Sequence, residues 1–189
     1  MQPVNLVADF NAKSNNSCEV RLISWELFSE LLEALLLNLK ECQIDVIVAI
    51  SRGGLIPGVM MSHALNIREF KVLDIKHSYD DSIRPRWREE LISKFKCLDI
   101  EGRRILIIDD IVGTGKTLKN AIEICIENSP LIVQTACIFI DSNVTDRQIE
   151  PDFYVERSTQ WIVFPWELEQ MATHKHTDMG VSILDGVNG

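Results

Sequence analysis

The sequence predicts an α/β fold with a mainly parallel sheet. Short apolar runs alternate along the chain with segments whose apolar residues recur at helical spacing, and this alternation is typical of β-α-β units. Three of the apolar runs lead into polar or glycine-rich loops, over residues 51–54, 76–90 and 109–117. Loops that follow parallel strands gather at one edge of the sheet, where α/β proteins bind ligands. We therefore expect a binding site for a small molecule at that edge.

The expected elements follow in order from Ser24, a residue type that favours the start of a helix. A helix is expected from there to Leu39, because apolar residues recur every three or four positions. Pro57 suits the first turn of a second helix over 57–65, and a third helix is expected over 117–127. The apolar runs that predict strands cover residues 45–50, 70–75, 105–109, 132–140 and 153–155.

Composition narrows the class of protein. At 189 residues, with 46% hydrophobic and 25% charged residues, the chain suits one globular domain. Its net charge of −9 disfavours general binding to nucleic acid or to anionic membranes. The five cysteines are scattered without metal-ligand spacing, which favours free thiols in a reducing cytoplasm. No signal peptide or membrane-spanning segment is recognisable, so we expect a cytoplasmic protein.

Two segments lack a clear periodicity. Residues 1–20 include a stretch rich in Asn and Ser and are expected to form a loosely ordered lead-in. Residues 76–90 carry many charges and are expected to form a long loop. The arginines at positions 84, 86 and 88 make a local basic patch, which either binds a small anion or is simply solvated.

The most informative stretch of the chain runs from Arg104 to Thr117 and reads RILIIDDIVGTGKT. A buried strand leads into the acids Asp109 and Asp110, and the segment Gly113–Thr117 then leads into a helix. The two glycines of that segment permit a sharp turn that brings backbone N–H groups together at the positive end of the helix dipole. Its two threonines add hydroxyl donors, so the sequence predicts a loop that holds a phosphate monoester.

Asp109 and Asp110 follow a buried strand, so they are expected either to ligate a metal ion or to accept hydrogen bonds from vicinal hydroxyls. Neighbouring carboxylates repel each other, and a cation or hydroxyl donors should therefore lie beside them. The GTGKT sequence also invites comparison with a P-loop nucleotide-binding motif. That motif requires a glycine where this chain has Asp110, so we reject a P-loop.

A second glycine turn, Ser51–Gly54, follows the apolar strand expected over 45–50. Its N–H groups, together with Arg52, could hold a further phosphate or a pyrophosphate group. A Gly-Gly pair after a strand is usually only a turn. In combination with the loop at 109–117, it predicts two anion-binding loops at one sheet edge.

These motifs together resemble the type I phosphoribosyltransferases, and most closely their xanthine-guanine and hypoxanthine branch. Residues 105–117 resemble that family's signature for 5-phosphoribosyl pyrophosphate (PRPP), and AISRGGLIPG at 49–58 is similar to its pyrophosphate loop. Residues 77–91 resemble its flexible loop, and WIVFPWE at 161–167 resembles the segment that covers the base. The resemblance extends over residues 45–167.

The resemblance implies a type I phosphoribosyltransferase fold with a small base-covering hood. Residues 1–20 would be a loosely ordered segment, residues 21–157 the PRPP-binding core, and residues 158–189 the hood and tail. It implies an Mg²⁺-dependent enzyme that transfers the 5-phosphoribosyl group of PRPP to a nitrogen heterocycle and releases pyrophosphate. By the same resemblance the protein would form a homo-oligomer, a dimer or a tetramer.

The resemblance also implies roles for individual residues. Asp109 and Asp110 would hold the ribose hydroxyls, directly or through Mg²⁺, and would act with Arg52 in catalysis. The 5-phosphate would be held by Gly113, Thr114, Gly115, Lys116 and Thr117. Pyrophosphate would be held by Ser51, Arg52, Gly53, Gly54, Ser78 and Tyr79, with a cis peptide bond at Ser51–Arg52 and contributions from Arg84, Arg86 or Arg88. The base would be bound by Trp161, Ile162 and Asp141.

The chain departs from its purine-using relatives at two positions. Gly113 stands where they carry an acid that handles a proton of the base, and Asp141 stands where they carry a lysine that donates to the 6-oxo group. An acid at 141 would accept a hydrogen bond from an exocyclic amine and would repel a carbonyl oxygen. These differences argue against hypoxanthine and guanine and for an altered nitrogen-ring acceptor.

Two other functions remain open from the sequence. One is a non-catalytic PRPP-sensing regulator on the same fold, and the other is a PRPP-binding hydrolase or lyase. The acidic charge and the presence of both the pyrophosphate loop and the flexible loop favour a transferase. Trp161, Phe164 and Trp166 have an alternative interpretation as core aromatics.

Overall fold

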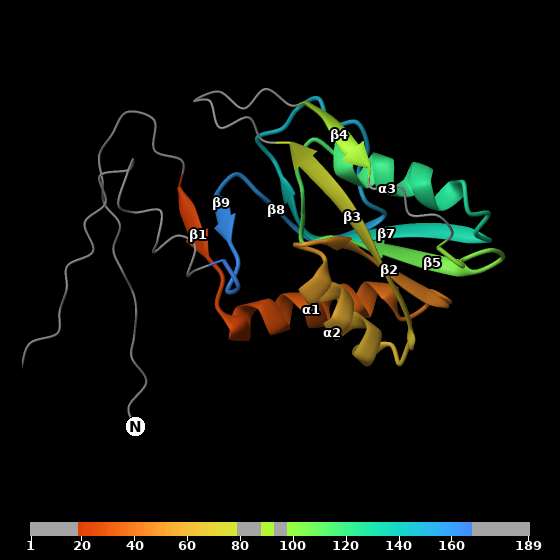
Figure 1. Cartoon of the computed structure of the whole chain (residues 1–189). Helices are drawn as coiled ribbons and strands as arrows, with labels where there is room; N and C mark the ends of the chain where they lie inside the picture. Colours follow the sequence, from red (N-terminus) through yellow and green to blue (C-terminus); the bar gives the residue numbers. More distant parts are fainter. Residues whose placement is uncertain (1–18, 79–87, 93–97, 168–189) are drawn as a thin grey trace, which may run out of the picture. The chain divides into compact units, whose positions relative to one another are not determined.

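Figure 1 shows a computed structural model of the chain, in which residues 19–78, 88–92 and 98–167 are described. In the described residues, seven strands form the main sheet, in the order β4-β3-β2-β5-β7-β6, with β8 also paired to β7. All of these pairs are parallel except β3 with β4. The strands are β2 (Val46–Ser51), β3 (Glu69–Ser78), β4 (Arg88–Ile92), β5 (Arg104–Ile108), β6 (Ile111–Val112), β7 (Ile132–Asp141) and β8 (Phe153–Ser158). The predicted mainly parallel sheet is confirmed.

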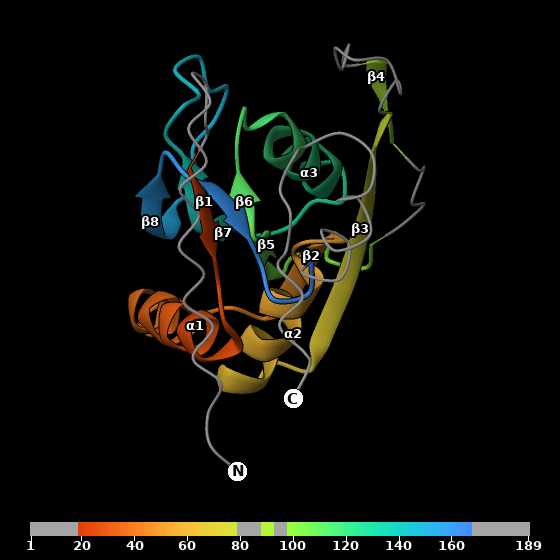
Figure 2. The same cartoon turned by 90° about the vertical axis from the view of Figure 1, so that its left-hand side faces the viewer.

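Helices cover both faces of this sheet. The helices are α1 (Trp25–Leu39), α2 (Leu55–Ala64) and α3 (Lys116–Ile126). Figures 1 and 2 show α1 and α2 on one face and α3 on the other. All three lie within about two residues of the expected helices. Among the described helices, none is long and apolar enough to cross a membrane.

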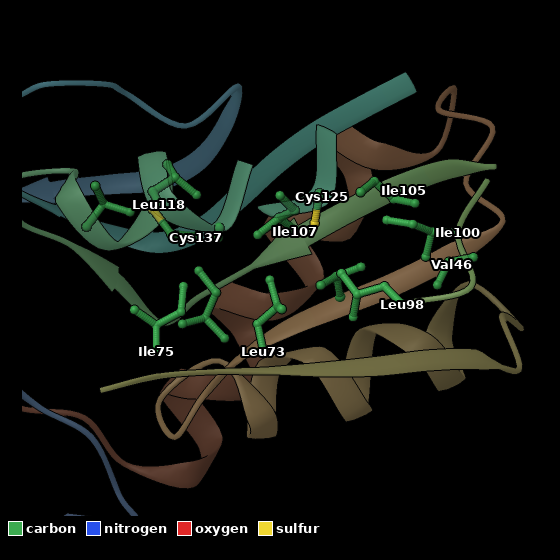
Figure 3. Packing of buried hydrophobic residues seen from close by; sticks show 14 of the residues in the cluster. Val46, Leu73, Ile75, Leu98, Ile100, Ile105, Ile107, Leu118, Cys125 and Cys137 are labelled. Atoms are coloured by element: carbon green, nitrogen blue, oxygen red, sulfur yellow. The ribbon is translucent and has the colours of Figure 1, made fainter. Parts of the chain in front are cut away.

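The core under α3 explains why the central strands read as continuous apolar runs. Alternate residues of β2 and β5 point toward α3, and the intervening residues are buried as well. A strand covered on both faces has no polar side to expose. The cluster in Figure 3 includes Val46, Ile105, Ile107, Leu118, Cys125 and Cys137. Burial of each large aliphatic side chain contributes roughly 1.5–3 kcal/mol to the free energy of folding, so this layer fixes the strand positions.

A separate small unit contains the described residues 19–24 and 160–167. In it, β1 (Val20–Leu22) pairs in parallel with β9 (Trp161–Val163). The rings of Phe164 and Trp166 stack with their centroids 4.7 Å apart, while Trp161 is 65% exposed. The strand β1 was not expected from the sequence, because three residues are too few to show a period.

The prediction of one long loop over 76–90 is wrong at both of its ends. β3 continues to Ser78, and β4 begins at Arg88 and pairs antiparallel with it, with a register irregularity between Lys76 and Ser78. Charged residues are common on the outer strands of sheets, where they discourage further pairing, and here they concealed the strand pattern. Residues 79–87 lie outside the described residues.

One ion pair fastens the beginnings of β2 and β5 together. The carboxylate of Asp45 accepts hydrogen bonds from the backbone N–H and the Nε of Arg104, both at 2.9 Å, and its Oδ1 lies 2.5 Å from Nη2. The backbone N–H of Asp45 in turn donates to the carbonyl oxygen of Arg104 at 2.8 Å. The hydrogen bonds from Arg104 hold the pKa of Asp45 well below its usual range.

The Asp45–Arg104 pair predicts a pH-dependent contribution to stability. The folded-state pKa of Asp45 is depressed, so its contribution is fully present above the unfolded pKa of about 3.9 and is lost progressively as the pH falls from there through the lower folded-state pKa. Asp45→Asn should lower the free energy of unfolding at pH 7, and its difference from wild type should shrink at about pH 3. Urea denaturation at both pH values measures this. Glu123→Gln, at an exposed position on α3, is the control. An equal loss at both pH values would contradict the prediction.

Candidate active site

The strand register brings the predicted loops to one edge of the sheet. β2 lies between β3 and β5, with Ala49 opposite Ile108 and Ser51 opposite Asp74. The turn after β2 and the acids after β5 therefore emerge side by side. The hydroxyl of Ser51 donates to Oδ1 of Asp74 at 3.1 Å, which ties this turn to β3 as well.

The turn Ser51–Gly54 packs directly against the acids. A Cβ atom at position 53 would overlap the carboxylate of Asp110, and one at position 54 would overlap the carbonyl oxygen of Ile108. Only glycine allows this approach at either position. The Ser51–Arg52 peptide bond is cis, as expected. The turn Ser51–Gly54 thus lies in direct contact with the carboxylate of Asp110 and the end of β5.

Asp109 and Asp110 interrupt the pairing of the chain with β7. β5 and β6 pair with successive stretches of β7 in one register, and the two acids lie between them. The carbonyl oxygen of Asp110 accepts from the backbone N–H groups of Ile138 and Phe139, both at 3.0 Å. The backbone of the pair is therefore fixed by β7.

The carboxyl groups of this pair lie in a partly buried setting. Asp110 is 8% exposed, and its Oδ1 accepts from the backbone N–H of Ile111 at 2.7 Å. Burial raises the pKa of Asp109, and the neighbouring charge of Asp110 raises it further. A cation or a pair of hydroxyl donors would favour the ionised form of both groups.

The donor set of this pair is compatible with Mg²⁺. Within the described part of the chain, no cluster of three or more His, Cys, Asp or Glu could enclose a metal ion. Mg²⁺ does not require such a cluster, because it commonly binds through one or two carboxylates and completes its shell with water and substrate phosphates. Asp109 and Asp110 supply oxygen ligands of that kind.

The loop before α3 has the shape that the sequence predicted. Gly115 has φ 75° and ends the turn in the left-handed region, and α3 begins at Lys116. The backbone N–H of Lys116 donates to the Thr114 hydroxyl at 3.4 Å. A Cβ atom at Gly113 would meet no other atom within 4 Å, so the space beside that residue is open. The side of the loop toward which a Gly113 side chain would point is therefore unobstructed.

The connection between β7 and β8 supports this loop, and sequence reasoning missed it. Arg147 donates from Nε to the carbonyl oxygen of Gly113 at 2.8 Å and from Nη2 to that of Asp141. The backbone N–H of Gln148 donates to the carbonyl oxygen of Thr114 at 2.9 Å. Residues 142–150 read as an ordinary polar loop, and no local signal in the sequence marks Arg147.

The carboxylate of Asp141 is oriented by Asn143. Oδ1 of Asp141 accepts from the backbone N–H of Asn143 at 2.9 Å and from its Nδ2 at 3.0 Å. The same Nδ2 donates to the carbonyl oxygen of Thr159 at 2.8 Å. Within the described residues, no protein hydrogen bond engages the other carboxylate oxygen of Asp141. The second carboxylate oxygen of Asp141 is therefore available as a hydrogen-bond acceptor at the end of β7.

Most of the predicted site residues lie together at one edge of the sheet, and the others lie elsewhere or outside the described residues. The sheet edge brings together Ser51–Gly54, Asp109, Asp110, Gly113–Thr117 and Asp141. Trp161 and Ile162 belong to the small unit with β1. Ser78 ends β3 and Arg88 begins β4. Tyr79, Arg84 and Arg86 lie outside the described residues.

Known proteins resemble this chain over most of its length. Residues 24–171 match the phosphoribosyl transferase domain. The chain is 28% identical to a xanthine-guanine phosphoribosyltransferase of Chromohalobacter salexigens over 147 residues, 77% of this chain and 83% of the relative. It is 29% identical over 149 residues to the enzyme of that name in Idiomarina loihiensis, covering 77% and 86% of the two chains. A purine phosphoribosyltransferase structure from Pyrococcus horikoshii matches with a TM-score of 0.67 and 34% identity, over 78% of this chain and 93% of that chain.

The close approach of the turn to the acid pair predicts different tolerances for two glycines. Gly54→Ala should lower the free energy of unfolding by roughly 1–3 kcal/mol, since its Cβ would overlap the Ile108 carbonyl oxygen and lie 2.7 Å from that of Ile50. Gly113→Ala is the matched control and should unfold within about 0.5 kcal/mol of wild type. Denaturant unfolding of both variants measures the difference. Equal stabilities would show that the turn does not pack as described.

Proposed function

This chain belongs to the phosphoribosyltransferase family, and we propose that the residues gathered at its sheet edge form the active site. The protein transfers the 5-phosphoribosyl group of PRPP to a nitrogen heterocycle and releases pyrophosphate. The observation that carries the site assignment is the contact between the turn Ser51–Gly54 and the carboxylate of Asp110. This contact places the turn proposed to bind pyrophosphate beside the two acids, and the acids precede the loop Gly113–Thr117 that is proposed to bind the 5-phosphate. A sugar that bears phosphates at both ends requires such an arrangement.

In the proposed complex, the loop Gly113–Thr117 holds the 5-phosphate. Its backbone N–H groups and the N-terminal end of α3 supply donors and positive potential. The turn Ser51–Gly54 holds the pyrophosphate, with Arg52, which is exposed at this edge, supplying positive charge. Asp109 and Asp110 lie between the two and accept hydrogen bonds from the ribose hydroxyls. Ser78, at the end of β3, and Tyr79, which lies outside the described residues, are proposed to contact pyrophosphate.

The two acids are also the proposed ligands of Mg²⁺. When bound there, Mg²⁺ would neutralise charge on the pyrophosphate as it leaves. The protein itself contributes mainly position: the two loops fix both ends of PRPP, and the base is held against C1 of the ribose. N–H groups of the turn Ser51–Gly54 stabilise the negative charge that develops on the leaving group. Exclusion of water by residues 76–90 would prevent hydrolysis.

We propose that the acceptor carries an exocyclic amine near the site of Asp141. The hydrogen bonds from Asn143 hold Oδ1 of that carboxylate, and its other oxygen would accept from the amine. Gly113 supplies no acid or base, although the space around it is open. Trp161 and Ile162 are proposed to cover and bind the base as part of a hood over residues 158–189. Because the relatives are named xanthine-guanine phosphoribosyltransferases, xanthine and guanine are among the bases to be tested as acceptors.

The remaining proposals concern the setting of the reaction. We place the enzyme in the cytoplasm, where scattered free cysteines persist, and in nucleotide salvage, where free bases are converted to nucleotides. A dimer or tetramer is proposed by analogy with the family.

Pyrophosphate release tests the proposed site. With PRPP and Mg²⁺, one base of a panel (hypoxanthine, guanine, xanthine, adenine, cytosine, uracil and orotate) should release pyrophosphate above a no-base control. Asp110→Asn should lower the rate by about 10²-fold or more, since it removes one charge of the pair. Chelation of divalent cations should do the same. Full activity of Asp110→Asn would exclude Asp110 from the reaction.

Two substitutions test the proposed acceptor. Gly113→Asp and Asp141→Lys restore the residue types of purine-using relatives, and a Cβ atom at position 113 would meet no other atom within 4 Å. A positioned acid or base is worth roughly 10²–10⁴ in rate. The double variant should therefore gain kcat/KM for hypoxanthine and guanine by about tenfold or more and lose it for the natural acceptor. If wild type already prefers hypoxanthine or guanine within the panel, the altered-acceptor proposal is wrong.

A further inference from the structure

A nearly buried guanidinium lies behind the loop before α3. The side chain of Arg147 is 7% exposed, although the connection between β7 and β8 that carries it is polar. Its Nε donates to the carbonyl oxygen of Gly113 at 2.8 Å, and its Nη2 donates to the carbonyl oxygen of Asp141. One planar group therefore bridges the first residue of the 5-phosphate loop and the last residue of β7.

The third nitrogen of the Arg147 guanidinium forms an ion pair with a carboxylate. Nη1 of Arg147 lies 3.0 Å from Oε1 of Glu150. Glu150 is half exposed and also pairs with Arg157, whose Nη2 lies 2.7 Å from Oε2. The charge of Arg147 is thus balanced from the side away from the two carbonyls. A lysine has a single nitrogen and no planar fork, so it cannot reproduce this arrangement.

The backbone around Arg147 forms a wall against the same loop. Gln148 donates its N–H to the carbonyl oxygen of Thr114 at 2.9 Å. A Cβ atom at Gly115 would lie 2.5 Å from the carbonyl oxygen of Ile149 and 3.3 Å from Cγ of Arg147. The loop Gly113–Thr117 therefore takes its shape partly from this second segment of chain. The N-terminus of α3 alone does not determine it.

We propose that Arg147 is a positioning residue that holds the 5-phosphate loop and the end of β7 at a fixed separation. The inference rests on the proposed assignment of the 5-phosphate to Gly113–Thr117 and of the base to Asp141. Arg147 acts through two backbone carbonyls. Its loss frees the Gly113 carbonyl and the loop that follows, so the N–H groups that bind phosphate lose their alignment. Within the described residues Arg147 makes no bond to the turn Ser51–Gly54, so the affinity of that turn for pyrophosphate should not change.

Calorimetric titration with two separate probes tests this role. Ribose 5-phosphate reports on the loop Gly113–Thr117, and pyrophosphate with Mg²⁺ reports on the turn Ser51–Gly54. Arg147→Met should raise the Kd of ribose 5-phosphate by about tenfold or more, as expected for loss of charged hydrogen bonds. The Kd of pyrophosphate should stay within about twofold of wild type, which a general loss of structure would not allow. Arg147→Lys should recover only a small part of the lost affinity.

Arg157→Met is the matched control, because Arg157 also pairs with Glu150. Among the described residues it makes no bond to the loop Gly113–Thr117, and its guanidinium lies over the ring of Tyr154 instead. It should bind both probes as wild type does. Unchanged ribose 5-phosphate binding in Arg147→Met would overturn the proposal, as would full recovery by lysine or equal weakening of both probes. If Arg147→Met does not fold, the lysine variant supplies the same comparison. Failure of the proposed function would give a different result from failure of the Arg147 proposal. The wild-type protein would then bind both probes but would not release pyrophosphate from PRPP.

Discussion

The close packing of the turn Ser51–Gly54 against the end of β5 is the constraint on which the site depends. Two glycines without side chains let the turn reach the carbonyl oxygen of Ile108 and the carboxylate of Asp110. β5 can receive it there because β2 pairs with β5 in parallel, and β5 ends at Ile108, opposite Ala49 and close to the end of β2 at Ser51. The apolar layer under α3 holds those strands in register. Core packing thus sets the spacing between the two proposed anion-binding loops.

The other side of the site depends on polar contacts. Asp110 is fixed through its backbone to Ile138 and Phe139, and Arg147 joins Gly113 to Asp141. β7 therefore positions both the acids and the proposed base-side carboxylate. Two ionised carboxylates that are buried beside each other are unfavourable unless a positive charge or hydrogen-bond donors stabilise them. A bound cation or a sugar hydroxyl would provide that stabilisation. The geometry and the electrostatics of this edge point to the same kind of ligand.

The sequence predicted the parts of this site that have local signals. Residues 104–117 carry a buried strand, paired acids and glycines within one short stretch, so both the loop and its chemistry could be inferred. We predicted a loop over the end of β3 and the beginning of β4, because charges on that side of the sheet hide the alternation of a strand. Arg147 could not be predicted as a site residue, because its role depends on a contact with Gly113, which is distant in the sequence. Asn143 is a neighbour of Asp141, but its bond to the carbonyl oxygen of Thr159 likewise exists only in the folded chain. The altered acceptor rests on Gly113 and Asp141, which only comparison with a family makes informative.

The central claim is that one sheet edge holds two separate anion-binding loops beside a single acid pair. Competition calorimetry tests it most directly: ribose 5-phosphate and pyrophosphate are titrated singly and then each in the presence of saturating amounts of the other, with Mg²⁺. We expect both to bind together, each with an affinity little changed by the other, and PRPP to displace both. Mutual displacement of ribose 5-phosphate and pyrophosphate would place them at one loop and would contradict the account.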